Sequence, residues 1–301
     1  MLERSDNRNA VLYRGLLQPE GPVLTLDGSL VLVEMAEERA CLTRFDAQGR
    51  RVEISQPGGR PTGVAVDGDG YYWVAGGPGN SLVRLSPQGQ TVLTIHGDGE
   101  GPFLFPNDLA FGPDGALYMT DSGMRPDEFI SGLAIRGDFA TARYDGCVFK
   151  IDPLAGRVLA RLETGIRFTN GIAFDASGAL FYAETLTARI YRHDLEGRPE
   201  LFAQLPPHES RGFCGPDGMA FGTSGNLYCA VYGAGYVAVV SSSGELIERL
   251  VTNGDRPTNV VFGHGNGRLL VTEVQNGCVE IIDVDDAPLQ LSHPVLGGAG
   301  R

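Results

Sequence analysis

A six-fold internal repeat constrains this chain more than any other feature of its sequence. Six segments align on a short motif that begins at Pro19, Pro61, Pro106, Thr169, Pro216 and Pro257. Seven residues after the motif's second position most copies carry a tight-turn pair, such as Asp69-Gly70. A repeat of about 45 residues cannot bury the faces of its own strands and needs neighbours on both sides. We therefore expect residues 1–301 to form a single domain built from six repeats.

Each copy reads as strand, turn, strand, loop, strand, turn, strand. In the second copy the expected strands are 62–67, 71–75, 81–86 and 91–96. An Asp-Gly pair between apolar runs favours a type I′ hairpin, in which both turn residues have positive φ. Six copies of four antiparallel strands predict an all-β fold, a six-bladed β-propeller. The outer strand of the last blade is left open, because residues 10–17 and residues 287–291 both qualify.

Composition restricts the partners that this chain can have. With 42% hydrophobic residues, 20% charged residues and a net charge of −13, the chain has no membrane-spanning run and no basic face for nucleic acid. The N-terminal residues lack the apolar core of a secretory signal, and the five cysteines show no CxxC spacing. We expect a cytoplasmic protein with reduced thiols and a small-molecule partner. The sequence does not indicate an oligomeric state.

The third copy is longer than the others, because 63 residues separate Asn107 from Asn170. The excess lies at 122–146, between the expected second and third strands, on the face where the innermost strands begin. We call this the upper face. The insertion contains Phe129 and Phe139, which favour a flap packed over the upper face and shaping substrate choice. The alternative is a surface loop without function.

The second position of the repeat carries oxygen-bearing side chains in four copies: Glu20, Asn107, Asn170 and Asp217. Equivalent positions of a propeller converge on its axis, so these residues should form one site. Carboxylates and amides are hard ligands that suit Ca²⁺, whereas Zn²⁺ usually takes His or Cys. We expect one divalent metal ion, Ca²⁺ first, with Zn²⁺, Mn²⁺ and Mg²⁺ as further candidates. Without a metal, the two facing carboxylates should repel each other and raise the pKa of one of them.

Several motifs resemble the gluconolactonase–regucalcin (senescence marker protein) family of six-bladed metal-dependent lactonases. They are Pro-Glu-Gly-Pro-Val at 19–23, Pro-Asn-Asp-Leu-Ala-Phe at 106–111, Thr-Asn-Gly-Ile-Ala-Phe at 169–174 and Gly-Pro-Asp-Gly-Met-Ala-Phe at 215–221. The resemblance implies that Glu20, Asn170 and Asp217 bind the metal and that Asn107 is a ligand or a substrate contact. It also implies that Asp217 is the general base or nucleophile. Asp108, one residue past Asn107, is the rival carboxylate for that role.

Other residues bear on substrate choice. Sugar lactonases of this family carry an Arg before the third-blade Asn, where this chain has Phe105-Pro106, so the substrate should be more apolar. Arg125 in the insertion is a candidate replacement for that Arg. The runs that contain Glu184 and Tyr232 resemble drug-responsive bacterial lactonases, which implies substrate contacts for both residues.

The expected function is that of a metal-dependent hydrolase that opens a small lactone or a related ester. Three alternatives are a phosphotriesterase-like activity at the same site, a non-enzymatic scaffold with a structural Ca²⁺, and a metal-free condensing enzyme of the strictosidine-synthase type. Nothing indicates a serine hydrolase, because the Gly-X-Ser-X-Gly motif is missing. A lone histidine at a strand end, such as His96, is more often a surface residue than a catalytic one.

Overall fold

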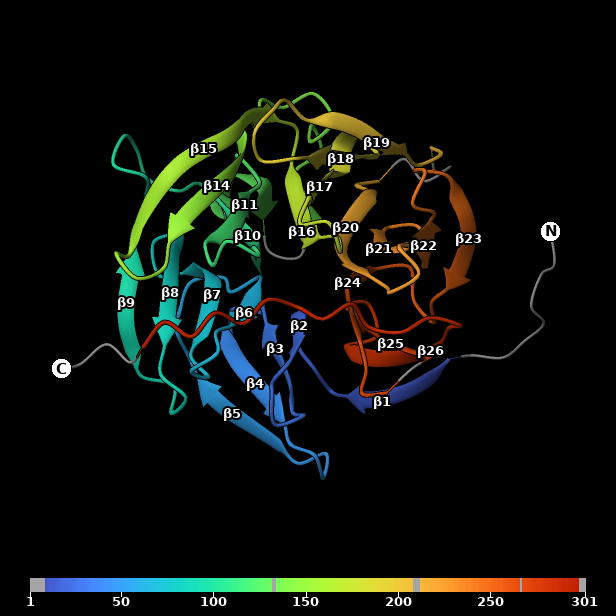
Figure 1. The fold of residues 1–301 in the computed structure, drawn as a ribbon, viewed down its shortest axis with the longest axis horizontal. Coiled ribbons are helices and arrows are strands. Elements are labelled where there is room, and N and C mark those ends of the chain that lie inside the picture. The colour runs from blue at the N-terminus through green and yellow to red at the C-terminus, as the bar shows by residue number, and fades with distance from the viewer. Residues whose placement is uncertain (1–8, 132–133, 208–211, 266, 298–301) are drawn as a thin grey trace.

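The computed structural model describes residues 9–131, 134–207, 212–265 and 267–297. Within them, six four-stranded antiparallel sheets stand around one axis like the blades of a propeller (Figure 1). The prediction of a six-bladed β-propeller is confirmed. Blades are numbered here by the repeat that supplies their innermost strand.

The strands fall into four layers around the axis. The innermost strands are β2 (Pro19–Leu24), β6 (Val64–Val66), β10 (Pro106–Phe111), β16 (Thr169–Phe174), β20 (Gly215–Phe221) and β24 (Pro257–Phe262). The second strands are β3 (Leu30–Glu34), β7 (Tyr72–Gly77), β11 (Leu117–Asp121), β17 (Leu180–Glu184), β21 (Leu227–Tyr232) and β25 (Arg268–Glu273). The third strands are β4 (Cys41–Phe45), β8 (Ser81–Leu85), β14 (Gly146–Asp152), β18 (Arg189–His193), β22 (Tyr236–Val240) and β26 (Cys278–Asp283). The outermost strands are β5 (Arg51–Ser55), β9 (Thr91–Ile95), β15 (Arg157–Ile166), β19 (Glu200–Gln204), β23 (Leu246–Val251) and β1 (Ala10–Arg14).

The insertion of blade three contains three short elements between β11 and β14. They are the helix α1 (Pro126–Phe129) and the paired strands β12 (Ile130–Ser131) and β13 (Ala134–Ile135). A 3-10 helix, η1 (Thr185–Thr187), follows β17 in blade four. Within the described residues, no helix has the length and apolar character needed to cross a bilayer.

The tight turns differ from the predicted type. In blade two the Asp67 N–H donates to Tyr71 O and the Gly70 N–H donates to Asp67 O, both at 3.0 Å. Among the described residues of this turn, only Gly70 has positive φ, at +80°. The loop therefore holds three residues and ends on a left-handed glycine, and the type I′ prediction is wrong. Asp67 stabilises the loop by accepting the N–H groups of Asp69 and Tyr71 through its carboxylate.

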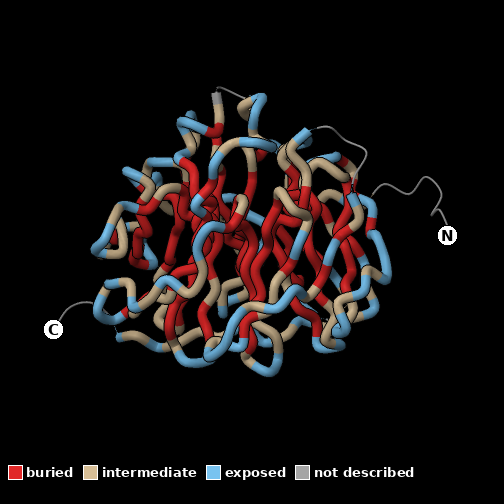
Figure 2. The backbone as a smooth tube through the Cα atoms, turned by 90° about the horizontal axis from the view of Figure 1, so that it is seen from above, coloured by how far each residue is buried: buried red, intermediate tan, exposed pale blue. Residues whose placement is uncertain are grey.

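Adjacent blades pack through a repeated aromatic contact. A ring on the second strand of one blade meets, edge to face, a ring at the end of the next blade's innermost strand. Such pairs are Trp73–Phe111, Tyr118–Phe174, Phe181–Phe221 and Tyr228–Phe262, with ring centroids 4.8 to 6.3 Å apart. Edge-to-face packing suits the charge distribution of aromatic rings. The inner strands are buried and the outer surface is exposed (Figure 2).

Two segments far apart in the sequence hold the ring together. β1 pairs antiparallel with β26, so the N-terminal segment supplies the outer strand of blade six. The C-terminal segment takes another path and crosses the lower face of the ring (Figure 1). Two backbone hydrogen bonds of 2.8 Å attach this segment to the blades. Thr223 N of blade five donates to Ala287 O, and Gly68 N of blade two donates to Pro294 O. We call residues 287–296 the strap.

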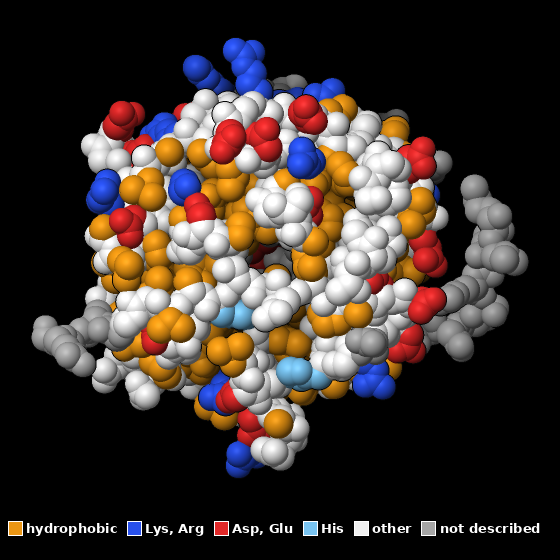
Figure 3. All heavy atoms as spheres, viewed as in Figure 1, with side chains coloured by type: hydrophobic (Ala, Val, Ile, Leu, Met, Phe, Trp, Pro, Cys, Tyr) orange, Lys and Arg blue, Asp and Glu red, His pale blue; other side chains and the backbone are white. Residues whose placement is uncertain are grey.

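A cavity of about 330 Å³ lies along the axis between the strap and the inner ends of the blades. Its walls are mostly apolar, and Asp108 and Asn259 also line it. Figure 3 views the strap face and shows a hollow near the axis, framed largely by hydrophobic side chains. All five cysteines are free thiols, and only Cys214 is not fully buried.

Candidate metal centre

An irregularity at the start of the innermost strands turns side chains toward the axis. The strand pairing shifts register between Glu20 and Val23, between Pro106 and Leu109, and equivalently in blades four, five and six. A bulge of this kind frees the backbone from the ladder and re-aims the residues it contains. The repeated second position lies in these bulges. This explains how residues distant in the sequence reach one point.

Three carboxylates and an amide meet on the axis. Glu20, Asp108 and Asp217 are each at most 7% exposed, so water screens their charges poorly. Asn259 joins them from blade six, where its Nδ2 donates to Glu20 Oε1 at 3.1 Å and to Asp108 Oδ2 at 3.4 Å. Asp108 Oδ2 also accepts the Ile172 N–H at 3.3 Å.

The electrostatics of this cluster are unfavourable without a cation. Burial raises the pKa of Glu20 well above its usual value, and the charges of Asp108 and Asp217 raise it further. Burial and the charge of Asp108 also raise the pKa of Asp217. Burial raises the pKa of Asp108 to about 6. No cationic side chain of the described residues offsets these shifts, so the sequence-based expectation of mutual repulsion is met.

Hydroxyl groups fix the orientation of the two amides. Asn107 Nδ2 donates to Ser122 Oγ at 2.9 Å, and Ser122 Oγ donates to Thr169 O. Asn170 Nδ2 donates to Thr185 Oγ1 at 3.2 Å, and Thr185 Oγ1 donates to Pro216 O. Because each hydroxyl gives its proton to a carbonyl, it can only accept from the amide. The NH₂ group therefore faces the hydroxyl, and the amide oxygen faces away from it.

This donor set fits a divalent cation. Glu20 Oε2 is buried and has no hydrogen-bond partner among the described residues. An orphaned carboxylate oxygen beside two further buried carboxylates is costly unless a cation joins them. The amides of Asn107 and Asn170 stand at the same repeated position, and their oxygens would add two ligands of the kind that suits Ca²⁺.

Asn259 was missed by the sequence analysis, although a signal for it exists. The residue after the repeated position is glycine in four blades, and Gly218 is one of them. A Cβ on Gly218 would lie 1.9 Å from Asn259 Cγ, which shows how closely the blades approach. Asp108 and Asn259 are the two residues with side chains at this position. They come from blades three and six and meet across the axis.

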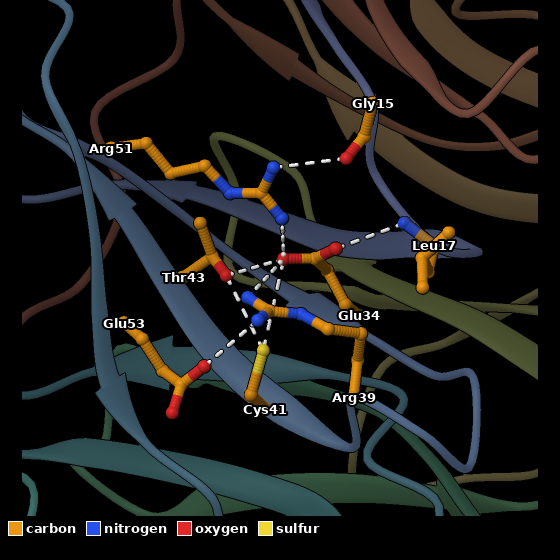
Figure 4. A network of polar contacts seen from close by, with 8 residues as sticks. All are labelled: Gly15, Leu17, Glu34, Arg39, Cys41, Thr43, Arg51 and Glu53. Atoms are coloured by element: carbon orange, nitrogen blue, oxygen red, sulfur yellow. Dashed lines mark hydrogen bonds and ion pairs between the residues drawn. The ribbon is translucent and has the colours of Figure 1, made fainter.

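Glu184 belongs to a second repeated set, at the ends of the second strands. Its Oε1 accepts the Arg167 N–H, and its Oε2 accepts from Thr187 and Tyr191. Glu34 is its counterpart in blade one, where it accepts the Leu17 N–H at 2.9 Å and also binds Thr43, Arg39 and Arg51 (Figure 4). These carboxylates hold the loop that precedes each innermost strand, and Glu184 does not join the axial cluster.

The remaining predicted substrate contacts are spread over the upper face. Phe105 is buried, and its ring lies 6.1 Å from that of Phe168. Tyr232 is close enough to Asp217 for the two to interact electrostatically, and burial raises its pKa. Arg125 is exposed and paired with Asp127, and nothing in the described residues brings it to the axis.

A second acidic cluster lies in blade six, where ligand atoms of Glu273, Cys278 and Glu280 approach within 4.8 Å of one another. Their carboxylates already have partners, however. Glu273 accepts three backbone N–H groups, from Arg256, Gln275 and Asn276. Glu280 accepts the N–H of Asn253. We interpret this cluster as the blade-six counterpart of the loop-holding set and not as a metal site.

Comparison with known proteins finds relatives over most of the chain. A gluconolactonase of Zymomonas mobilis is 27% identical over 236 residues, which cover 74% of this chain and 63% of that protein. A diisopropyl-fluorophosphatase of Loligo vulgaris is 25% identical over 287 residues, which cover 86% of this chain and 87% of that protein. The solved structure of a calcium-binding protein, regucalcin, from Agrobacterium tumefaciens has a TM-score of 0.76 at 20% identity, covering 95% and 97% of the two chains.

A family model described as the SMP-30/Gluconolactonase/LRE-like region matches residues 93–275. That match spans more than half of the chain, and it includes the blade-three, blade-four and blade-five parts of the axial cluster. The resemblance inferred from the motifs is confirmed, and the chain belongs to the SMP-30/gluconolactonase/LRE-like family.

Proposed function

We propose that this protein hydrolyses a small lactone at an axial Ca²⁺ site. The observation that carries the proposal is the buried cluster of Glu20, Asp108 and Asp217. Among the described residues this cluster has no counter-cation, and Glu20 Oε2 has no hydrogen-bond partner. A relative named gluconolactonase and two named lactonases support the same reaction class.

Glu20, Asn107, Asn170 and Asp217 would hold the cation. When bound, a divalent cation supplies a Lewis acid that polarises the ring carbonyl and stabilises negative charge on its oxygen. Ser122 and Thr185 keep the amide oxygens of Asn107 and Asn170 in place. Asn259 fixes Glu20 through the bond to Oε1. The chain thereby presents an arrangement that needs little reorganisation during the reaction.

Asp217 is our choice for the general base. Both oxygens of Asp108 already accept hydrogen bonds, from the N–H groups of Leu109 and Ile172 and from Asn259. Asp108 also lines the cavity on the strap side of the cluster. Asp217 does not line that cavity, and Tyr232 is within electrostatic range of it. A carboxylate oxygen of Asp217 would take the proton of the attacking water, or attack the carbonyl itself.

The function is tested by measuring the metal content of the purified protein and proton release from a panel of lactones and aryl esters. We expect Ca²⁺-dependent opening of a lactone that is lost on chelation and restored by added Ca²⁺. If the metal-loaded protein opens no lactone and no ester, the proposal is wrong and a binding scaffold becomes the better explanation.

The assignment of the base is tested by comparing Asp217→Asn with Asp108→Asn at saturating Ca²⁺. Removing a positioned base typically costs about 10²- to 10⁴-fold in rate, and we expect that loss in Asp217→Asn. Metal loading of both variants is checked by calorimetry, so that a lost ligand is not mistaken for a lost base. An inactive Asp108→Asn beside an active, metal-loaded Asp217→Asn would reverse the assignment.

A further inference from the structure

The residues two positions before the repeated site form a ring at the upper end of the axis, which we call the rim. They are Gln18, Arg60, Phe105, Phe168, Gly215 and Arg256. The rim is divided, because blades three and four supply phenylalanines whereas blades one, two and six supply an amide and two arginines. Gln18 and Phe168 adopt φ of +55° and +66°. Left-handed backbone is strained for such residues and is concentrated at functional sites.

The aromatic half of the rim is covered by the insertion of blade three. The ring of Phe129, at the end of α1, lies 4.7 Å from that of Phe168 and 5.3 Å from that of Phe213. Phe105, Phe129 and Phe168 are buried in one apolar cluster with Met124 and Tyr144. This half offers an apolar wall.

Arg60, on the opposite half, is a partly buried cation that has no counter-ion among the described residues. Its Nη2 donates to Gln18 Oε1 at 3.0 Å and its Nη1 donates to Met35 O at 3.4 Å. Its Nε is buried and donates to no acceptor among the described residues, and no described carboxylate lies within ion-pair distance. Buried arginines are normally paired with an anion, so this guanidinium has unused binding capacity.

Arg60 reaches toward the axis and not away from it. It belongs to blade two, yet it interacts electrostatically with Tyr232, which ends β21 in blade five on the far side of the ring. Tyr232 in turn interacts with Asp217 of the axial cluster. The guanidinium therefore lies at the upper end of the axis, bonded to Gln18 and on the same side of the axial cluster as Tyr232.

We propose that Arg60 determines substrate specificity by binding an anionic group, of the carboxylate type, on a lactone whose apolar part lies against the aromatic half of the rim. This inference rests on the proposed lactone hydrolysis. A guanidinium is suited to a carboxylate because its planar N–H groups match the two oxygens. Arg60 thus supplies the arginine that the sequence analysis sought in Arg125.

The test compares two matched substrates, a γ-butyrolactone with a ring carboxylate and the same lactone with a ring carboxamide. Arg60→Gln should raise KM for the carboxylate about 10- to 100-fold, the usual loss for a hydrogen bond to a charged group. KM for the carboxamide and kcat for both should not change, and Arg60→Lys should recover part of the loss. Arg50→Gln removes the same charge on an exposed lower-face turn and serves as the control.

The competing explanation is that Arg60 only balances the charge of the axial carboxylates. In that case Arg60→Gln would weaken Ca²⁺ binding in calorimetry and lower kcat equally for both substrates, and our inference would be wrong.

A binding measurement separates this inference from the proposed function. Tetrahydrofuran-2-carboxylate cannot be hydrolysed, and its affinity for the Ca²⁺-loaded protein should fall in Arg60→Gln but not in Arg50→Gln. An unchanged affinity overturns the inference, even if no lactone is ever opened.

Discussion

The orientation of a side-chain amide decides whether Asn107 and Asn170 present an oxygen or an NH₂ group to the axis. Ser122 and Thr185 fix this orientation. Each hydroxyl donates its proton to the backbone carbonyl that precedes the next blade's axial residue, so it can only accept from the amide NH₂ group. In blades two and six the equivalent donor is the repeated residue itself, Thr62 or Thr258. The same bond between blades thus serves packing in two blades and ligand orientation in two others.

This division of roles gives a matched pair of variants. Thr185→Ala removes the bond to Pro216 O and also frees the amide of Asn170, whereas Thr62→Ala removes only the bond to Pro106 O. Loss of a group that orients a metal ligand usually costs about 10- to 100-fold in metal affinity. We expect that loss of Ca²⁺ affinity in Thr185→Ala and none in Thr62→Ala, with similar melting temperatures. Equal Ca²⁺ affinities in calorimetry would refute the orienting role.

The sequence makes the candidate ligands recognisable but not their surroundings. Glu20, Asn107, Asn170 and Asp217 were visible because the repeat aligns them, and equivalent positions of a propeller converge. Asn259 and Arg60 were not, because their roles depend on contacts across the axis between non-equivalent blades. Glu184 was predicted to contact the substrate from a resemblance of motifs, whereas its hydrogen bond to the Arg167 N–H group cannot be recognised from the sequence.

At the scale of elements, the insertion of blade three is the part of the fold that departs most from the repeat. Its location between β11 and β14 followed from spacing alone. Its internal structure did not, since α1, β12 and β13 are too short for any periodicity to show. The insertion packs on the rim through Phe129 and Phe139, whose rings contact Phe168 and Phe213.

We predict that the insertion governs the ranking of substrates. Phe129→Ala should raise KM for lactones with an apolar side chain more than for the unsubstituted ring, because the apolar wall of the rim loses its support. The control is Phe202→Ala, which removes a ring from β19 that packs on Phe181, away from the rim. Identical substrate rankings for wild type and Phe129→Ala, with both proteins folded and Ca²⁺-loaded, would make the insertion a surface loop without function.

Another element-scale contact should govern acid stability. Asp98, in the loop before β10, binds Arg161 of β15 and accepts the N–H groups of Glu100 and Gly101. The bond from Arg161 is the main cause that lowers the pKa of Asp98 to about 2. A depressed pKa stabilises the fold above the unfolded value near 4, and this contribution is lost as the pH falls toward 2. Asp98→Asn should flatten the loss of thermal stability between pH 4 and 2. An unchanged pH slope in thermal melts would refute the assignment.

At the scale of the whole molecule, a propeller must be prevented from opening between its first and last blades. β1 does this by completing blade six, so that one sheet contains both ends of the repeat array. The sequence left this open, because residues 10–17 and 287–291 are both short and weakly patterned. The two segments have different roles in the structure. The N-terminal segment forms the outer strand of blade six, and the C-terminal segment crosses the lower face from blade five to blade two.

The strap should therefore stabilise the fold without taking part in the metal site. It joins blade five to blade two, through Leu289 N to Phe221 O at one end and through Leu296 N to Asp69 Oδ2 at the other. It also lines one end of the axial cavity through Leu289 and Leu291. A chain ending at Ala287 would lose these bonds and expose the apolar cavity wall, so its melting temperature should fall. For a domain of 150–250 residues each kcal/mol lost lowers it by about 2–4 °C, and somewhat less is expected at this length.

Removing only residues 298–301 is the control for that truncation. Ca²⁺ affinity should be the same in both truncated proteins, because the ligand set stands at the opposite end of the innermost strands and is held by bonds between neighbouring blades. A longer truncation that melts like the control would show that β1 alone keeps the ring closed. A longer truncation that loses Ca²⁺ affinity would show that blades two and five must be held at a fixed distance for the axial ligands to converge.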